Sequence, residues 1–311
     1  MSQICVFVRW ILEYFYYFCD WFLGILSPDI YISMKLSFAN AITAIAVLFI
    51  AVLVAPLSAF ADSGGSGRGE GLNVVLLGDS NTWIGGDDCS KSKGWTKWFI
   101  EKFKPASCRS YARSGATWTN TVSTRLDISG YSEVLGDNNV IYNQVMRLVD
   151  AVDHGAQAVP DIIILYAGIN DAWFQNRRPG VFAEMPQDAF ADTSGFITSR
   201  RPSEVLSLAA SVRYGCELLM QHFPEAQIVL VTPAQATVCG YDEIRKAADV
   251  ITECGHRMSL PVISLDKGGG IYRAAENVRR TNTYDGAHTS EQGARRHGYF
   301  IAAQLTAILQ Y

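Results

Sequence analysis

The sequence has few of the features that mark metal-dependent or nucleotide-dependent proteins. It holds five histidines in 311 residues, none of them in a His-Glu-x-x-His motif, and its seven cysteines show no zinc-ligand spacing. No Gly-Lys-Ser/Thr follows its glycine-rich stretch, so a phosphate loop is not indicated. Lys and Arg (26) are outnumbered by Asp and Glu (30), and the formal net charge of −4 disfavours nucleic-acid binding. We therefore expect no metal site and no nucleic-acid partner.

Cysteine usage leaves the disulfides open. Five cysteines follow position 61, and an odd count leaves at least one of them unpaired within the chain. A predicted helix separates Cys239 from Cys254, which disfavours that pair. Cys216 lies on an apolar helix stripe and is interpreted as a core residue. A bond between Cys89 and Cys108 stays open.

The N-terminal part of the chain resembles a targeting segment. Residues 41–57 are almost wholly apolar, with Lys35 before them and the small-residue site Ala59-Phe60-Ala61 after them. We expect a signal peptide over 34–61 with cleavage before Asp62, and hence a secreted or periplasmic protein. The alternative is an uncleaved membrane anchor, because the apolar run approaches the shortest span of a bilayer. A membrane partner is expected only in that case.

The first 33 residues fit neither a signal peptide nor a membrane span. Their aromatic-rich stretch carries Arg9, Glu13 and Asp20, which are costly at a bilayer centre. We interpret 1–33 as a membrane-associated or non-authentic extension, with translation starting at Met34. Residues 62–71 are predicted to be a Gly/Ser-rich linker, and 72–311 one globular domain.

Short apolar runs alternate with helical patterns along that domain. The runs are continuous in apolar residues, as is typical of strands buried on both faces of a parallel sheet. Strands are predicted at 73–77, 109–112, 161–166, 227–232 and 261–265, and helices at 94–103, 140–152, 203–222, 242–256 and 290–309. The alternation predicts a three-layer α/β/α sandwich with a central parallel sheet of about five strands. The long stretches 117–139 and 172–202 are expected to be pocket-forming or surface loops.

Polar motifs follow two of these runs. Ser80 lies in Gly78-Asp79-Ser80-Asn81 after the first strand, and Asn170 lies in Gly168-Ile169-Asn170-Asp171 after the third. Because ligands bind at the carboxyl ends of the strands in such sheets, we expect these side chains to converge. Ser80 is the candidate nucleophile, and an alcohol needs a base to remove its proton.

His288 is the candidate base, since the other four histidines lie in or near predicted helices. It precedes Thr289-Ser290-Glu291-Gln292, which matches a capping box opening the last helix. Asp285, three residues earlier, is placed to orient the imidazole. An oxyanion hole is expected from the backbone N–H groups of Ser80 and Gly115 and the side-chain amide of Asn170. This set of groups predicts an ester hydrolase.

These residues resemble the SGNH (GDSL-type) hydrolases from about position 73 to the C-terminus. The Gly-Asp-Ser block matches at Ser80, the lone glycine of the second block at Gly115, the Gly-x-Asn-Asp block at 168–171 and the Asp-x-x-His block at 285–288. Asn81 stands where many members have leucine. The resemblance implies a flavodoxin-like sandwich, no metal or organic cofactor, and hydrolysis of esters or thioesters. Gly-x-Ser-x-Gly is absent around Ser80, because Thr82 occupies the last position, so the α/β-hydrolase elbow is disfavoured.

The substrate is indicated only by aromatic residues beside the motifs. Trp83 and Trp173 nearly abut the first and third motifs, and flat rings suit the binding of sugars. Combined with export, this favours a carbohydrate esterase that removes small acyl groups such as acetate. The alternatives are an acyltransferase, a lipase or thioesterase acting on longer chains and, outside the enzymes, a non-catalytic carbohydrate-binding module. Asp79 and Asp171 are expected to hold loops.

Overall fold

The computed structural model describes residues 69–132 and 135–309. The predicted extension at 1–33, the signal peptide at 34–61 and most of the linker at 62–71 lie outside the described residues. Ser66–Tyr311 forms one compact unit, which contains the whole described part of the chain.

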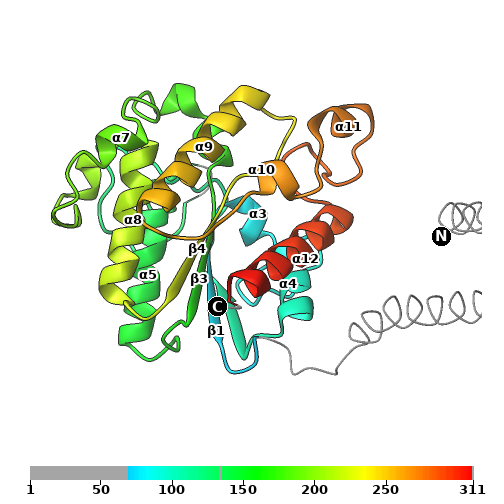
Figure 1. Cartoon of the computed structure of the whole chain (residues 1–311), viewed down its shortest axis with the longest axis horizontal. Coiled ribbons are helices and arrows are strands. Elements are labelled where there is room, and N and C mark those ends of the chain that lie inside the picture. The colour runs from blue at the N-terminus through cyan, green and yellow to red at the C-terminus, as the bar shows by residue number, and fades with distance from the viewer. Residues whose placement is uncertain (1–68, 133–134, 310–311) are drawn as a thin grey trace, which may run out of the picture. The chain divides into compact units, whose positions relative to one another are not determined.

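A five-stranded parallel sheet forms the centre of this unit (Figure 1). Its strands are β1 (Asn73–Gly78), β2 (Ser107–Ser110), β3 (Ile162–Tyr166), β4 (Gln227–Val231) and β5 (Val262–Ile263). They pair in the order β2-β1-β3-β4-β5, with Val74 opposite both Cys108 and Ile162. The chain therefore leaves β1 toward one edge and returns to build the other, so the strand order reverses between β1 and β3. This reversal is where doubly wound sheets bind their ligands.

Helices cover both faces of the sheet. Figure 1 shows α5 (Ile141–Asp153), α8 (Leu208–His222) and α9 (Tyr241–Arg257) on one face, and α4 (Trp95–Phe103) and α12 (Glu291–Ile308) on the other. Alternate residues of β1 enter different cores: Val75 and Leu77 pack under the first group, Val74 and Leu76 under the second. The predicted three-layer α/β/α fold with a parallel sheet is confirmed.

Short elements complete the rim of the sheet. They are α3 (Ser80–Trp83), α6 (Ile169–Trp173), η1 (Gln175–Arg177), α7 (Pro186–Ala189), η2 (Pro202–Glu204), α10 (Leu265–Gly268) and α11 (Arg273–Val278). The stretch predicted as a loop at 172–202 thus contains short helices. No helix among the described residues combines the length and apolar character that a bilayer crossing requires.

Several element boundaries differ from the prediction for identifiable reasons. The second strand lies at Ser107–Ser110 instead of 109–112. Its side chains are mostly polar and give no apolar pattern, so its position is set by its pairing with β1. Helix α8 begins at Leu208, since the Ser207 hydroxyl accepts a hydrogen bond from the Ala210 N–H and caps the helix there. The last strand is shorter than predicted and ends before α10 begins at Leu265.

Candidate active site

The turn between β1 and α3 presents Ser80. Ser80 is the first residue of α3, and the Asp79 carboxylate caps this helix by accepting a hydrogen bond from the Asn81 N–H at 3.0 Å. On the other side of the turn, the buried Gln144 side chain accepts a hydrogen bond from the Gly78 N–H (2.8 Å) and donates one to the Gly78 carbonyl (2.9 Å). The serine is therefore fixed at the carboxyl end of a strand that is buried from Val74 onward.

The segment before α12 brings the imidazole of His288 to this serine. His288 Nε2 lies 2.8 Å from Ser80 Oγ, although the two residues are 208 positions apart. His288 Nδ1 lies 2.6 Å from Asp285 Oδ2. A hydroxyl, an imidazole and a carboxylate thus form one hydrogen-bonded chain, which can withdraw the serine proton and stabilise the resulting imidazolium.

Backbone hydrogen bonds hold Asp285 in this chain. Its Oδ1 accepts from the N–H groups of Ala287 (2.9 Å) and His288 (2.8 Å), so Oδ2 alone faces the ring. Partial burial disfavours the charge on Asp285, but the hydrogen bonds from His288 and Ala287 outweigh it, and the pKa of the carboxyl lies below its ordinary value. Asp285 is therefore a carboxylate at neutral pH.

The ring of His288 also packs against Tyr284. Their rings are stacked with centroids 5.7 Å apart and planes inclined by 18°, and Lys93 Nζ lies 5.1 Å from the centre of the tyrosine ring. The capping of α12 differs from the prediction: Ser290 is the N-cap, and Thr289 Oγ1 instead donates to the Lys93 carbonyl at 2.8 Å. The segment that carries His288 is therefore anchored to the loop before α4.

Gly115 and Asn170 lie beside the same turn. Gly115 has φ 69°, a left-handed conformation that favours glycine, and the neighbouring Arg113 N–H donates to the Gly78 carbonyl at 3.1 Å. Asn170 Nδ2 donates one hydrogen to the Ala116 carbonyl at 2.8 Å, which leaves its second hydrogen for another acceptor. Within the part of the chain that the structure describes, neither the Ser80 N–H nor the Gly115 N–H donates a hydrogen bond to another protein atom.

The two further motif aspartates hold the structure around these groups. Asp171 accepts hydrogen bonds from the N–H groups of Trp118 and Thr119 and from the Thr119 hydroxyl, and thereby fixes the loop after Gly115. Burial raises the pKa of Asp171, and it raises that of the Asp79 carboxyl to about 7. These contacts agree with the prediction that both aspartates hold loops.

The other histidines are placed as the sequence indicated. His154 caps the end of α5, His222 and His256 lie in last turns, and His297 is buried within α12. Within 69–132 and 135–309, no group of three or more His, Cys, Asp or Glu residues is arranged to hold a metal ion.

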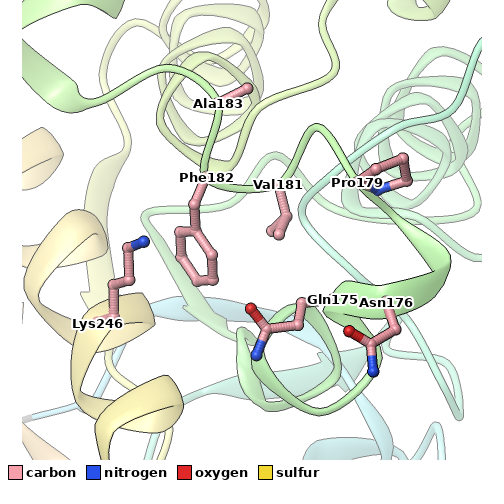
Figure 2. A pocket seen from close by; sticks show the side chains of 7 residues that line it. All are labelled: Gln175, Asn176, Pro179, Val181, Phe182, Ala183 and Lys246. Atoms are coloured by element: carbon pink, nitrogen blue, oxygen red, sulfur yellow. The ribbon is translucent and has the colours of Figure 1, made fainter.

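Both candidate substrate-binding tryptophans are accessible. Trp83 is 44% exposed at the end of α3, and Trp173 is 37% exposed at the end of α6, where its ring stacks on Phe174. The residues that follow Phe174 line a hollow of about 460 Å³, which lies between the η1–α7 region and α9. Figure 2 shows Phe182 and Val181 on one side of this hollow and Lys246 of α9 approaching from another.

Sequence reasoning missed two contributors to the site. Gln144 is a buried polar residue on a helix that was predicted only from its apolar pattern, and its contacts with Gly78 span 66 positions. Tyr284 gave a weak signal, because an aromatic residue directly precedes the Asp-x-x-His block. The catalytic roles of the predicted residues stay predictions, although the structure brings Ser80, Asp285 and His288 into one hydrogen-bonded chain.

Known proteins provide an independent comparison. The family model described as "GDSL-like Lipase/Acylhydrolase family" matches residues 76–296. No curated protein matches the chain in sequence.

Solved structures resemble the chain over almost their full lengths. One is 20% identical with a TM-score of 0.53, and the match covers 78% of this chain and 99% of that one, which shows a shared fold. A lipase/acylhydrolase from Enterococcus faecalis is 18% identical (TM-score 0.45; 77% and 98% covered), and an acetyl xylan esterase, AlAXEase, is 16% identical (TM-score 0.45; 76% and 100% covered). Because the family model matches well over half of its residues, the chain belongs to the GDSL-like lipase/acylhydrolase family and is an ester hydrolase.

Proposed function

We propose that Ser80, His288 and Asp285 act as a catalytic triad that removes small acyl groups, such as acetyl, from a carbohydrate ester. The observation that carries the proposal is the position of His288, whose two ring nitrogens lie 2.8 Å from Ser80 Oγ and 2.6 Å from Asp285 Oδ2.

In this mechanism, His288 Nε2 takes the proton of Ser80 as Oγ attacks the ester carbonyl. The negative oxygen of the tetrahedral intermediate is bound by the N–H groups of Ser80 and Gly115 and by the second hydrogen of Asn170 Nδ2. His288 then returns the proton to the leaving alcohol. In the second half of the reaction, His288 takes a proton from a water molecule, which attacks the carbonyl of the acyl-serine and releases the acid and free Ser80. Asp285 keeps the proton on Nδ1 and stabilises the imidazolium.

Exposed aromatic rings support a sugar substrate. Trp83 follows the serine on its own short helix, and Trp173 follows Asn170 on another, so each ring lies within one helical turn of a catalytic group. Rings of this size offer flat apolar faces to the C–H faces of sugars. Export, with membrane attachment only if the leader is retained, is proposed from the apolar segment at 41–57 and the small residues at 59–61.

A chain-length series of chromogenic esters tests the reaction and the acyl preference together. We expect acetate and propionate esters to be hydrolysed fastest, and Ser80→Ala and His288→Ala to lose about 10⁴-fold or more in kcat. Ser194→Ala and His154→Ala remove an exposed serine and an exposed histidine elsewhere and serve as matched controls. Full turnover by Ser80→Ala would remove the assignment, and a preference for long chains would favour a lipase or thioesterase.

The carbohydrate part of the proposal needs a separate experiment. With an acetylated oligosaccharide, Trp83→Ala and Trp173→Ala should raise KM severalfold, yet leave the hydrolysis of a chromogenic acetate ester unchanged. Phe196→Ala, at an aromatic residue that is 52% exposed before α8, is the control. Unchanged KM values for the oligosaccharide would contradict a sugar site at these rings. Acetyl transfer to added sugars that outpaces hydrolysis would instead identify an acyltransferase.

A further inference from the structure

Two cysteines from separate elements meet at the edge of the sheet. Cys89 lies in the loop between α3 and α4, and Cys108 lies in the edge strand β2. Their sulfur atoms are 3.9 Å apart, across a separation of 19 positions. Cys89 is fully buried against the core that α4 and α12 cover, whereas Cys108 is the more exposed residue of the pair.

The distance is that of a hydrogen bond between two thiols, which the Cys108 thiol donates to Cys89 Sγ. A disulfide requires about 2.05 Å between the sulfurs, so the two must approach each other by about 2 Å for the bond to form. The backbone at Cys89 is already fixed, because its N–H donates to the Gly86 carbonyl at 3.0 Å and the Ser110 N–H donates to the Asp87 carbonyl at 2.9 Å. The loop is therefore held against the strand with the two sulfurs in contact.

The remaining cysteines of the described chain are placed differently. Cys216 and Cys254 are buried in the core on the opposite face of the sheet, where Cys254 Sγ donates to the Ala209 carbonyl, and Cys239 is partly exposed before α9. Among the residues that the structure describes, Cys89 and Cys108 are the pair whose sulfurs share a hydrogen bond. We propose that Cys89 and Cys108 form a disulfide in an oxidising environment and that this bond anchors the loop that supports the catalytic groups.

The oxidation balances with a low-molecular-weight disulfide as oxidant. Cys108 Sγ loses its proton and attacks oxidised glutathione, which forms a mixed disulfide and releases one glutathione thiol. Cys89 Sγ then loses its proton and attacks Cys108 Sγ, which forms the internal S–S bond and releases the second glutathione thiol. The protein loses two electrons and two protons, and the oxidant gains them. The hydrogen bond with Cys89 and burial raise the pKa of the Cys108 thiol, so the first step is slow at neutral pH.

The loop that the bond would anchor contacts both halves of the site. The Lys93 carbonyl accepts the hydrogen bond from Thr289, the residue next to His288, at 2.8 Å. At the other end of the loop, the Asp87 carboxylate pairs with the Arg113 guanidinium at 2.9 Å, two residues before Gly115. A crosslink at Cys89 therefore restrains the supports of the imidazole and of the predicted oxyanion hole together.

Mapping of the full-length wild-type protein tests the pair directly. The reduced protein is equilibrated in a series of glutathione buffers, quenched with acid, alkylated in denaturant so that buried thiols react, digested with trypsin and analysed by mass spectrometry. Trypsin yields peptides 69–91 and 103–109, which contain one cysteine of the pair each. In oxidising buffers we expect these peptides to be joined, about 2 Da lighter than their sum, while Cys216, Cys239 and Cys254 carry the alkyl label. Separate labelled peptides in the most oxidising buffer, or a bond from Cys108 to Cys239, would overturn the proposal.

The anchoring role has its own measurement. We expect the oxidised protein to melt about 6 °C or more above the reduced one, and Cys108→Ala to abolish the difference while Cys239→Ala keeps it. Equal melting temperatures of oxidised and reduced wild type would contradict anchoring. Because the buffers set the redox state and no catalytic assay enters, the outcome is independent of the proposed export and of the proposed substrate.

Discussion

Replacing Asp285 by asparagine tests the proposed division of labour within the triad. In the structure, Oδ1 of Asp285 accepts two backbone N–H groups, and Oδ2 faces His288 Nδ1 at 2.6 Å. The asparagine oxygen must keep the Oδ1 position, since an amide NH₂ there would face two donors. Its NH₂ group then faces Nδ1 of the imidazole.

That arrangement forces the wrong tautomer on His288. Nδ1 must accept a hydrogen bond from the new amide, so the ring proton moves to Nε2, which then points a hydrogen at Ser80 Oγ and cannot accept its proton. We expect kcat/KM to fall about 10⁴-fold, which corresponds to about 5 kcal/mol of transition-state stabilisation. The magnitude is that seen for the equivalent change in a serine protease triad.

The assay is hydrolysis of a chromogenic acetate ester at pH 7 to 8. Asp192→Asn changes an exposed carboxylate that accepts a hydrogen bond from the Ser194 N–H, and it should leave kcat/KM unchanged. Thermal unfolding of both variants checks that the fold is kept. An Asp285→Asn protein with kcat/KM within tenfold of wild type would refute the tautomer argument.

Three further changes test the site and its buried groups. Asn170→Ala should lower kcat about 10²–10³-fold by removing an oxyanion donor, with Asn176→Ala unchanged when both are assayed on the same ester. Burial raises the pKa of Asp79 to about 7, so the native state binds more protons than the unfolded state between about pH 4 and pH 7. The free energy of unfolding therefore falls as the pH rises through this range, by on the order of 4 kcal/mol. Asp79→Asn should remove this fall in urea titrations across the same range. Burial lowers the pKa of His297 to about 4, so the free energy of unfolding falls as the pH drops from about 6.5 toward 4, by on the order of 3 kcal/mol. His297→Met should abolish this loss in the same titrations. A variant that is as acid-sensitive as the wild type would contradict the prediction.

The central strands could be predicted from the sequence because they are almost entirely apolar. Strands β1, β3 and β4 lie within one residue of the predicted ranges, since each is buried on both faces and its residues have no competing role. The edge strand β2 reads Ser-Cys-Arg-Ser, so its position depends on its partner, and the prediction missed its start by two residues.

The motifs could be found locally, whereas their supports could not. Ser80, Asp285 and His288 stand in short blocks at element boundaries, and a parallel sheet brings such boundaries to one edge. Gln144, by contrast, acts across 66 positions, and Lys93 reaches Thr289 across 196. No periodicity or spacing indicates such long-range polar contacts, because they arise only after the layers have packed.

Covalent trapping of the nucleophile tests the central claim most directly. An alkyl fluorophosphonate reacts with a serine whose hydroxyl is activated by a neighbouring base, and tryptic digestion isolates Ser80 in peptide 69–91. We expect one adduct, on Ser80, in the wild-type protein, no adduct there in Ser80→Ala, and strongly slowed labelling in His288→Ala. An adduct on a different residue, or no adduct on Ser80 in a protein that hydrolyses esters, would contradict the account.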